Sequence, residues 1–118
     1  MVFVKGSSTA ISNTFGFGEG GQGASCSITG TATIFCVGGR GGGDGWTGQA
    51  AGTANRGNGG DGTGGSALGS AGGSGIVVVG YLTSDVTGLT VTGGTATTDG
   101  SYTVRSFTTV GSATFGIS

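Results

Sequence analysis

The two cysteines, Cys26 and Cys36, carry the most reactive side chains of this chain. Alternation in the segment between them places both, with Ile28 and Ile34, on one face of an extended chain. A hairpin that closes near Thr31 would set the two sulfurs opposite each other, at a Cα separation that a disulfide accepts. The alternative is two reduced thiols that serve as small buried residues in a protein assembled inside a cell. Both interpretations are compatible with the sequence.

Catalytic chemistry has little support in these residues. The chain has no histidine and only five carboxylates, and no nucleophile lies beside a plausible base. The glycines around Arg40 do not end in the Gly-Lys-Ser/Thr of a phosphate-binding loop. Asp44 and Asp61 each follow glycines, but neither completes the repeat of calcium-binding β-helices. We therefore predict a protein that is not an enzyme and has no cofactor and no metal site.

Binding is the chemistry that the remaining large side chains could perform. Trp46 is the only tryptophan and lies among glycines, where it would either stack on a ligand such as a sugar ring or cap the packed glycine segments. The other polar and charged side chains embedded among the glycines share that setting. The receptor-contact candidates are Trp46, Arg40, Asp44, Asn55, Arg56 and Asn58, with Gln49 and Asp61 as further members.

Glycine dominates the segment that carries these candidates. It makes up 32 of the 118 residues, is concentrated in residues 38–75, and occurs with no proline in the chain. Such a segment is either a flexible linker or a set of left-handed helices with three residues per turn, in which glycine lets backbones pack closely. Apolar flanks and a frame of three favour the packed form. The frame consists of Gly39, Gly42, Gly45, Gly48, Ala51, Ala54, Gly57 and Gly60, and a slipped frame follows at Gly69, Gly72 and Gly75.

The elements on either side of the glycines are β-prone. Residues 76–82 form an apolar β-branched run, and residues 88–92 and 101–107 alternate apolar with polar side chains. Gly93-Gly94 and Asp99-Gly100 between them are turn signals of hairpins. We predict three parts in one cooperative domain: an N-terminal β segment with the cysteine hairpin (1–37), a glycine-rich block of polyglycine-II-like or irregular extended chain (38–75), and an antiparallel, sandwich-like C-terminal part (76–118). The expected fold class is all-β with essentially no α-helix.

Charge and length exclude several functions. A net charge of −1 with four Lys and Arg residues gives no electrostatic surface for nucleic acid and no polybasic anchor for a membrane. The apolar run 76–82 is far shorter than the roughly 20 residues that span a bilayer. A chain of 11.0 kDa buries only a modest core, so we expect it to associate with copies of itself or with other proteins.

Three stretches in order resemble the glycine-rich domains of bacteriophage tail fibres and other tail-associated proteins. Residues 51–60 (AGTANRGNGG) followed by 72–81 (GGSGIVVVGY) are similar to the glycine stretch of that family and the strand that follows it. Residues 93–104 (GGTATTDGSYTV) and 107–108 (FT) are similar to its threonine-rich turn, Tyr-Thr strand and Phe-Thr segment. The family continues into a Gly-Thr-Phe-Thr-Val strand, and residues 111–118 (GSATFGIS) are a looser version of it.

The resemblance implies a virion protein that is assembled in the host cytoplasm. In the family the glycine block forms bundled polyglycine-type helices, and its loops contact receptors on the host surface. It thus implies a non-enzymatic tail-fibre-type adhesin whose partners are other virion proteins and a bacterial surface glycan or outer-membrane protein, with a homotrimer by analogy. The alternative is a structural protein that decorates or cements a capsid or tail, or a head fibre. A third hypothesis is ice binding by flat glycine-rich faces.

Overall fold

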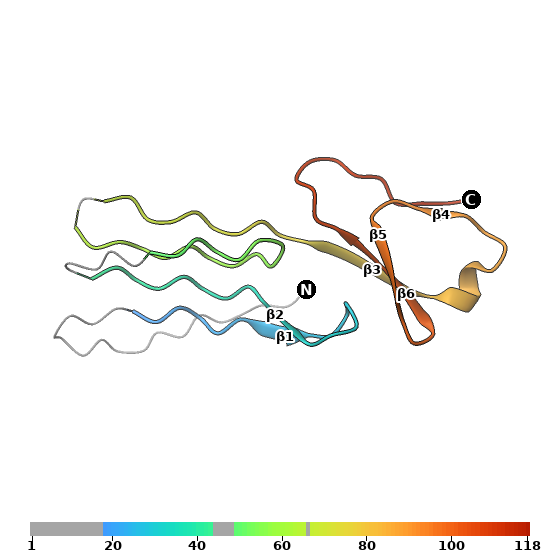
Figure 1. Cartoon of the computed structure of the whole chain (residues 1–118), viewed down its shortest axis with the longest axis horizontal. Helices are drawn as coiled ribbons and strands as arrows, with labels where there is room; N and C mark the ends of the chain where they lie inside the picture. The colour runs from blue at the N-terminus through green and yellow to red at the C-terminus, as the bar shows by residue number, and fades with distance from the viewer. Residues whose placement is uncertain (1–17, 44–48, 66) are drawn as a thin grey trace. The chain divides into compact units, whose positions relative to one another are not determined.

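The computed structural model describes residues 18–43, 49–65 and 67–118. The chain divides into two compact units. The glycine unit comprises residues 1–25 and 34–75, and the C-terminal unit comprises residues 26–33 and 76–118. The predicted N-terminal segment is thus divided between the two. The described residues form an all-β structure with antiparallel pairing and no α-helix, as the sequence predicted (Figure 1).

The main sheet of the C-terminal unit has three antiparallel strands in the order β3-β6-β5: β3 (Val77–Leu82), β6 (Tyr102–Phe107) and β5 (Thr95–Asp99). Val77 pairs with Phe107 and Leu82 with Tyr102, while Asp99 also pairs with Tyr102 from the other side. Both long strands coincide with the predicted apolar and alternating runs. β6 is the central strand and carries Val104, which is only 3% exposed and is the one buried hydrophobic residue of the described chain.

Two turn signals lead to different outcomes. Gly100 has a φ of 57° and closes the tight turn between β5 and β6, as the Asp99-Gly100 signal predicted. Gly93-Gly94 does not close a hairpin, so that prediction was wrong. β4 (Val91–Thr92) pairs instead with β7 (Gly116–Ile117), far along the chain. Gly93 has a φ of 91°, and a Cβ there would lie 2.0 Å from the carbonyl oxygen of Thr114, so the backbone bends away into β5 only because no side chain is present.

Two short elements complete the structure. A 3₁₀ helix, η1 (Thr83–Val86), follows β3. β1 (Ala24–Cys26) and β2 (Thr33–Phe35) pair with each other, and the backbone N–H of Gly30 donates to the carbonyl of Ser27 in the turn between them. A hairpin therefore exists where the sequence predicted one, but its strands are only three residues long.

The glycine unit contains extended segments that run alongside one another without being β-strands (Figure 1). Their backbone hydrogen bonds recur every third residue. The N–H groups of Gly38 and Gly41 donate to the carbonyls of Gly21 and Gly18, at 2.8 and 2.7 Å. Those of Gly59 and Gly62 donate to Val37 and Arg40, at 2.8 and 2.7 Å. A β-ladder has a period of two, so these segments are held by a different hydrogen-bond pattern.

The segment formed by residues 56–63 has neighbours on several sides. It donates to residues 37 and 40, and it also bonds to Ala50 and to residues 70 and 73. A Cβ on Gly60 would lie 2.1 Å from the carbonyl oxygen of Ser70, and one on Gly39 would lie 1.9 Å from that of Gly60. Backbone therefore packs directly on backbone at these positions of the predicted frame. Gly75 of the slipped frame has no atom near its Cβ position, and the close contact there falls on Gly73 instead.

Candidate functional site

Two side chains of the candidate receptor surface are used to hold the glycine unit together. The backbone N–H of Val37 donates to Oδ1 of Asn58 at 3.1 Å, and that of Arg40 donates to Oδ1 of Asp61 at 2.8 Å. The two acceptors are three residues apart, as are the two donors. Because backbone bonds from Gly59 and Gly62 run back to the same two residues, each pair forms one repeat of a ladder between neighbouring segments.

Asp61 connects three other segments through both its carboxylate and its backbone. Its Oδ2 accepts from the backbone N–H of Ala50 at 3.1 Å, its own N–H donates to the Ala50 carbonyl at 3.0 Å, and its carbonyl accepts from Ser70 at 2.8 Å. The amide of Arg40, followed by that of Ala50, lowers the pKa of the Asp61 carboxyl below its ordinary value. The charge of Arg40 acts in the same direction, and partial desolvation acts against it.

The lowered pKa of Asp61 predicts an acid-sensitive glycine unit. A carboxyl whose folded pKa is depressed stabilises the fold above its unfolded pKa of about 3.9. That contribution is lost as the pH falls through the lower folded pKa, when the two N–H groups lose a charged acceptor. The melting temperature should therefore fall as the pH drops below about 4, and in Asp61→Asn it should already be lower at pH 7 and change less with acid. Melting curves followed by circular dichroism measure both.

Asn58→Asp is the matched variant, because it places a carboxylate at the corresponding position of the ladder. Its Oδ1 keeps the acceptor for the Val37 amide, so we expect folding at pH 7 and a steeper loss of stability in acid than in the parent chain. Equal acid dependence in the parent chain and in Asp61→Asn would show that this carboxylate does not contribute.

Asn55 is the third candidate that bonds internally. It lies in a turn with a φ of 59°, its N–H donates to Oγ of Ser74 at 3.0 Å, and its Oδ1 accepts from the same hydroxyl at 3.2 Å. Asparagine tolerates this left-handed conformation better than most residues. Gln49 likewise donates from Nε2 to Oγ1 of Thr63 at 2.8 Å. The amide side chains that sequence reasoning assigned to a receptor therefore make contacts within the chain.

The arginines are the candidates that remain available to a partner. Arg40 is 57% exposed, and its Nε lies 3.6 Å from Oε2 of Glu19, which is 70% exposed. An ion pair this exposed contributes little to stability. Arg56 is partly exposed, and its backbone N–H donates to the carbonyl of Ser74. Asp44 and Trp46 lie outside the described residues.

Cys26 and Cys36 are free, and both are exposed. The structure thus differs from both interpretations of this pair, since no disulfide joins them and neither is buried. The reason is local: Cys36 has a φ of 58°, which ends the extended alternation at Phe35. Its backbone N–H donates to the carbonyl of Arg56, so Cys36 is hydrogen-bonded to a neighbouring segment of the glycine unit and not to a hairpin partner.

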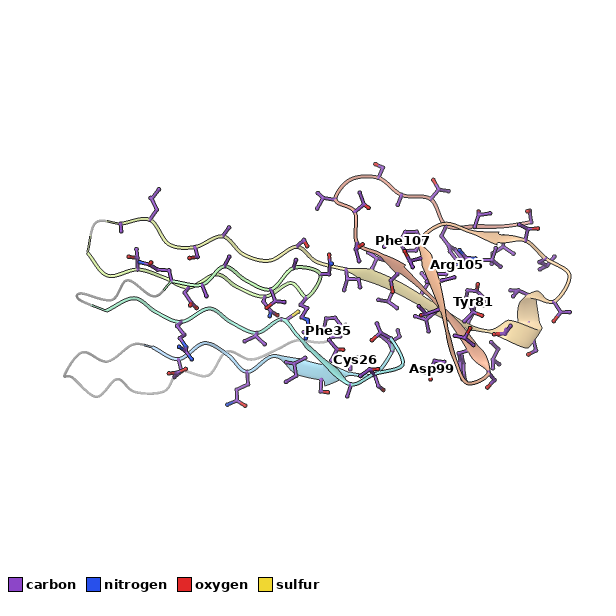
Figure 2. The ribbon with its side chains drawn as sticks, in the orientation of Figure 1. Cys26, Phe35, Tyr81, Asp99, Arg105 and Phe107 are labelled. Carbon is purple, nitrogen blue, oxygen red and sulfur yellow. The ribbon has the colours of Figure 1, made fainter. Side chains whose placement is uncertain are left out.

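Arg105 is a charged residue whose role the sequence did not indicate. It lies on β6, and its guanidinium donates to the carbonyls of Gly93 and Val91, at 2.7 and 2.5 Å, and to the hydroxyl of Tyr81 at 3.2 Å. Figure 2 labels Arg105 and Tyr81 in the C-terminal unit. One half-buried side chain therefore connects the three-stranded sheet to β4. Phe115 packs on Tyr81 with ring centroids 6.3 Å apart.

A pocket of about 240 Å³ opens on the C-terminal unit. Apolar side chains of β3 and β6 form one wall, and the loop that precedes β7 forms the other. It is lined by Val77, Val79, Phe107, Thr109, Gly111, Ala113 and Phe115. A second hollow of about 260 Å³ shares Phe107, Thr109 and Ala113 with it. Neither is lined by a charged or nucleophilic pair. The first suits apolar contact, whereas threonine and serine side chains make up most of the lining of the second.

Within residues 18–43, 49–65 and 67–118, no three His, Cys, Asp or Glu side chains gather into a possible metal site. No helix in that part of the chain is long and apolar enough to cross a membrane. No family model, curated protein or solved structure matches this sequence.

Proposed function

We propose that this chain is a non-enzymatic adhesin of the bacteriophage tail-fibre type, in which the glycine unit is a polyglycine-II-like bundle that presents side chains to a host surface. The observation that carries the proposal is the three-residue recurrence of hydrogen bonds between the extended segments. Left-handed helices with three residues per turn bond to their neighbours at that interval. The close approach at Gly39 and Gly60 requires glycine in the same way.

A bundle of this kind suits recognition, because backbone contacts and a few internal acceptors hold it together. Side chains that point outward are then free to serve a partner without loss of a core. Arg40 is such a side chain, and Trp46 is the aromatic candidate of the same block. Aromatic and arginine side chains are enriched among residues that dominate binding energy. The proposed partner is a bacterial surface glycan or outer-membrane protein, and the proposed location is the virion after assembly in the host cytoplasm.

The alternative is a structural role in the virion, as a decoration or cement protein or a head fibre. It is favoured by the apolar side chains that the C-terminal unit leaves exposed, among them Val77, Leu89, Val110 and Ile117. Exposed apolar side chains mark contacts with other proteins where they gather into one patch. In this proposal the C-terminal unit, in which Arg105 joins the two sheets in a sandwich-like arrangement, attaches the chain to other virion proteins.

The test is a binding assay with fluorescently labelled protein on intact bacterial cells and, in parallel, on virus particles stripped of it. Saturable binding to cells is expected. Trp46→Ala should weaken that binding by about tenfold or more, the usual cost of losing an aromatic anchor. Tyr102→Ala, which removes a half-exposed aromatic of the C-terminal unit, is the control and should bind as the parent does. Binding to particles alone would contradict the adhesin proposal and support the structural one.

A further inference from the structure

The C-terminal unit leaves several of its large apolar side chains exposed to solvent. Val104 is its single buried hydrophobic residue among those described, while Leu82, Leu89, Tyr102 and Ile117 are each more than a third exposed. A small domain gains most of its stability from apolar burial. The unit therefore has apolar surface left for another molecule to cover.

The pocket beside Phe107 is the concave part of that surface. Val77 and Val79 of β3, with Phe107 and Phe115, give it apolar walls, and Figure 2 labels Phe107. β3 is also an edge strand of its sheet in this chain, since only β6 pairs with it. Edge strands that are apolar and carry no charged residue favour intermolecular contact.

Val110 is an exposed apolar residue of the same surface. Its side chain is 86% exposed, and its two neighbours, Thr109 and Gly111, both line the pocket. An apolar projection thus stands at the rim of an apolar hollow. Val110 cannot enter this hollow itself, because its two neighbours form part of the wall. The Val110 side chain of a second chain can enter it.

We infer that a second copy of this chain fills the pocket, with Val110 of one copy seated against Phe107 of the other. Each copy supplies one projection and one pocket, so every pocket is filled in a two-fold pair or in a closed ring. No lining residue carries a charge, so identical surfaces meet there without like-charge repulsion. This inference does not depend on the proposed host binding.

The size of the surface sets the expected strength of association. Stable pairs bury roughly 800 Å² on each partner, about 20 to 30 residues. β3 with residues 107–115 offers fewer residues than that. Association through this surface is therefore expected to be weak and to depend on protein concentration.

Sedimentation velocity of the full chain from about 1 μM to 1 mM tests the inference. We expect the mass to rise with concentration from 11.0 kDa to a multiple of it. Val110→Asp should raise the dissociation constant about tenfold or more. Leu68→Asp is the matched control, because Leu68 is 93% exposed in the glycine unit, and it should associate as the parent does.

A second variant examines the pocket side. Ala113 is exposed and lines the pocket, so Ala113→Arg should block entry of Val110 with a similar loss of association. Unchanged melting temperatures of both variants at low concentration would exclude unfolding as the cause. A parent chain of single mass over the whole range would overturn the inference, and so would Val110→Asp associating as the parent does.

Discussion

Gly60→Ala is expected to disrupt the packing of the glycine unit and to lower its free energy of unfolding by about 3 kcal/mol. The added Cβ would lie 2.1 Å from the carbonyl oxygen of Ser70 and 2.4 Å from that of Ala71. Both atoms belong to backbone, which cannot move aside as a side chain can. The segment carrying Gly60 also bonds to neighbours on several sides, so a shift that relieves one contact weakens others.

Gly75→Ala is the matched control in the same unit. No atom lies within 4 Å of the Cβ position of Gly75, so the substitution should be neutral or stabilising by about 0.4–1 kcal/mol through the unfolded chain. Hydrogen exchange read by NMR measures the difference, since the amides of Gly38, Gly41, Gly59 and Gly62 should be protected in the parent and in Gly75→Ala. Equal protection of these amides in Gly60→Ala would mean that backbones do not pack directly there.

The second large effect is expected at Arg105. Arg105→Met removes three hydrogen bonds and leaves the carbonyls of Val91 and Gly93 without this donor. Hydrogen bonds made by charged groups contribute about 1.5–3 kcal/mol each, and we expect a net loss of about 3 kcal/mol because the methionine retains the apolar packing of the stem. Denaturant unfolding of the full chain measures the loss.

Two further variants separate charge from geometry. Arg105→Lys keeps the charge but lacks the planar fork that reaches both carbonyls and the Tyr81 hydroxyl, so it should lose most of the same stability. Arg40→Met removes an exposed arginine that pairs only loosely with Glu19. This variant should lose less than about 1 kcal/mol of its free energy of unfolding. An Arg105→Lys protein as stable as the parent would show that charge, and not the forked geometry, is what matters.

The C-terminal strands could be predicted because their pattern is local. Alternation over residues 101–107 and the Asp99-Gly100 turn correspond to β6 and the turn before it. The pairing of β4 with β7 could not be predicted in this way, because it joins Val91 to Ile117 with all of β5 and β6 between them along the chain and leaves no short-range signal. The same holds for Arg105, whose partners on β3 and β4 are distant in sequence.

The candidate site was harder to predict than the fold. The sequence pattern of a polar residue among glycines is the same whether its side chain faces a partner or accepts a hydrogen bond from a backbone N–H. Asn58 and Asp61 accept such bonds from residues 21 positions earlier. The periodic spacing of Asn55, Asn58 and Asp61, three residues apart, is the signal that could have identified them, since it matches the period of the segments that they join.

The backbone-on-backbone contacts of the glycine unit also determine how its stability responds to temperature. The heat capacity of unfolding rises with exposed apolar area and falls with exposed polar area. Unfolding this unit exposes mainly peptide groups, such as those hydrogen-bonded at Gly38 and Gly59. Its stability curve should therefore be flatter than that of a domain with an apolar core, and cooling should weaken it less.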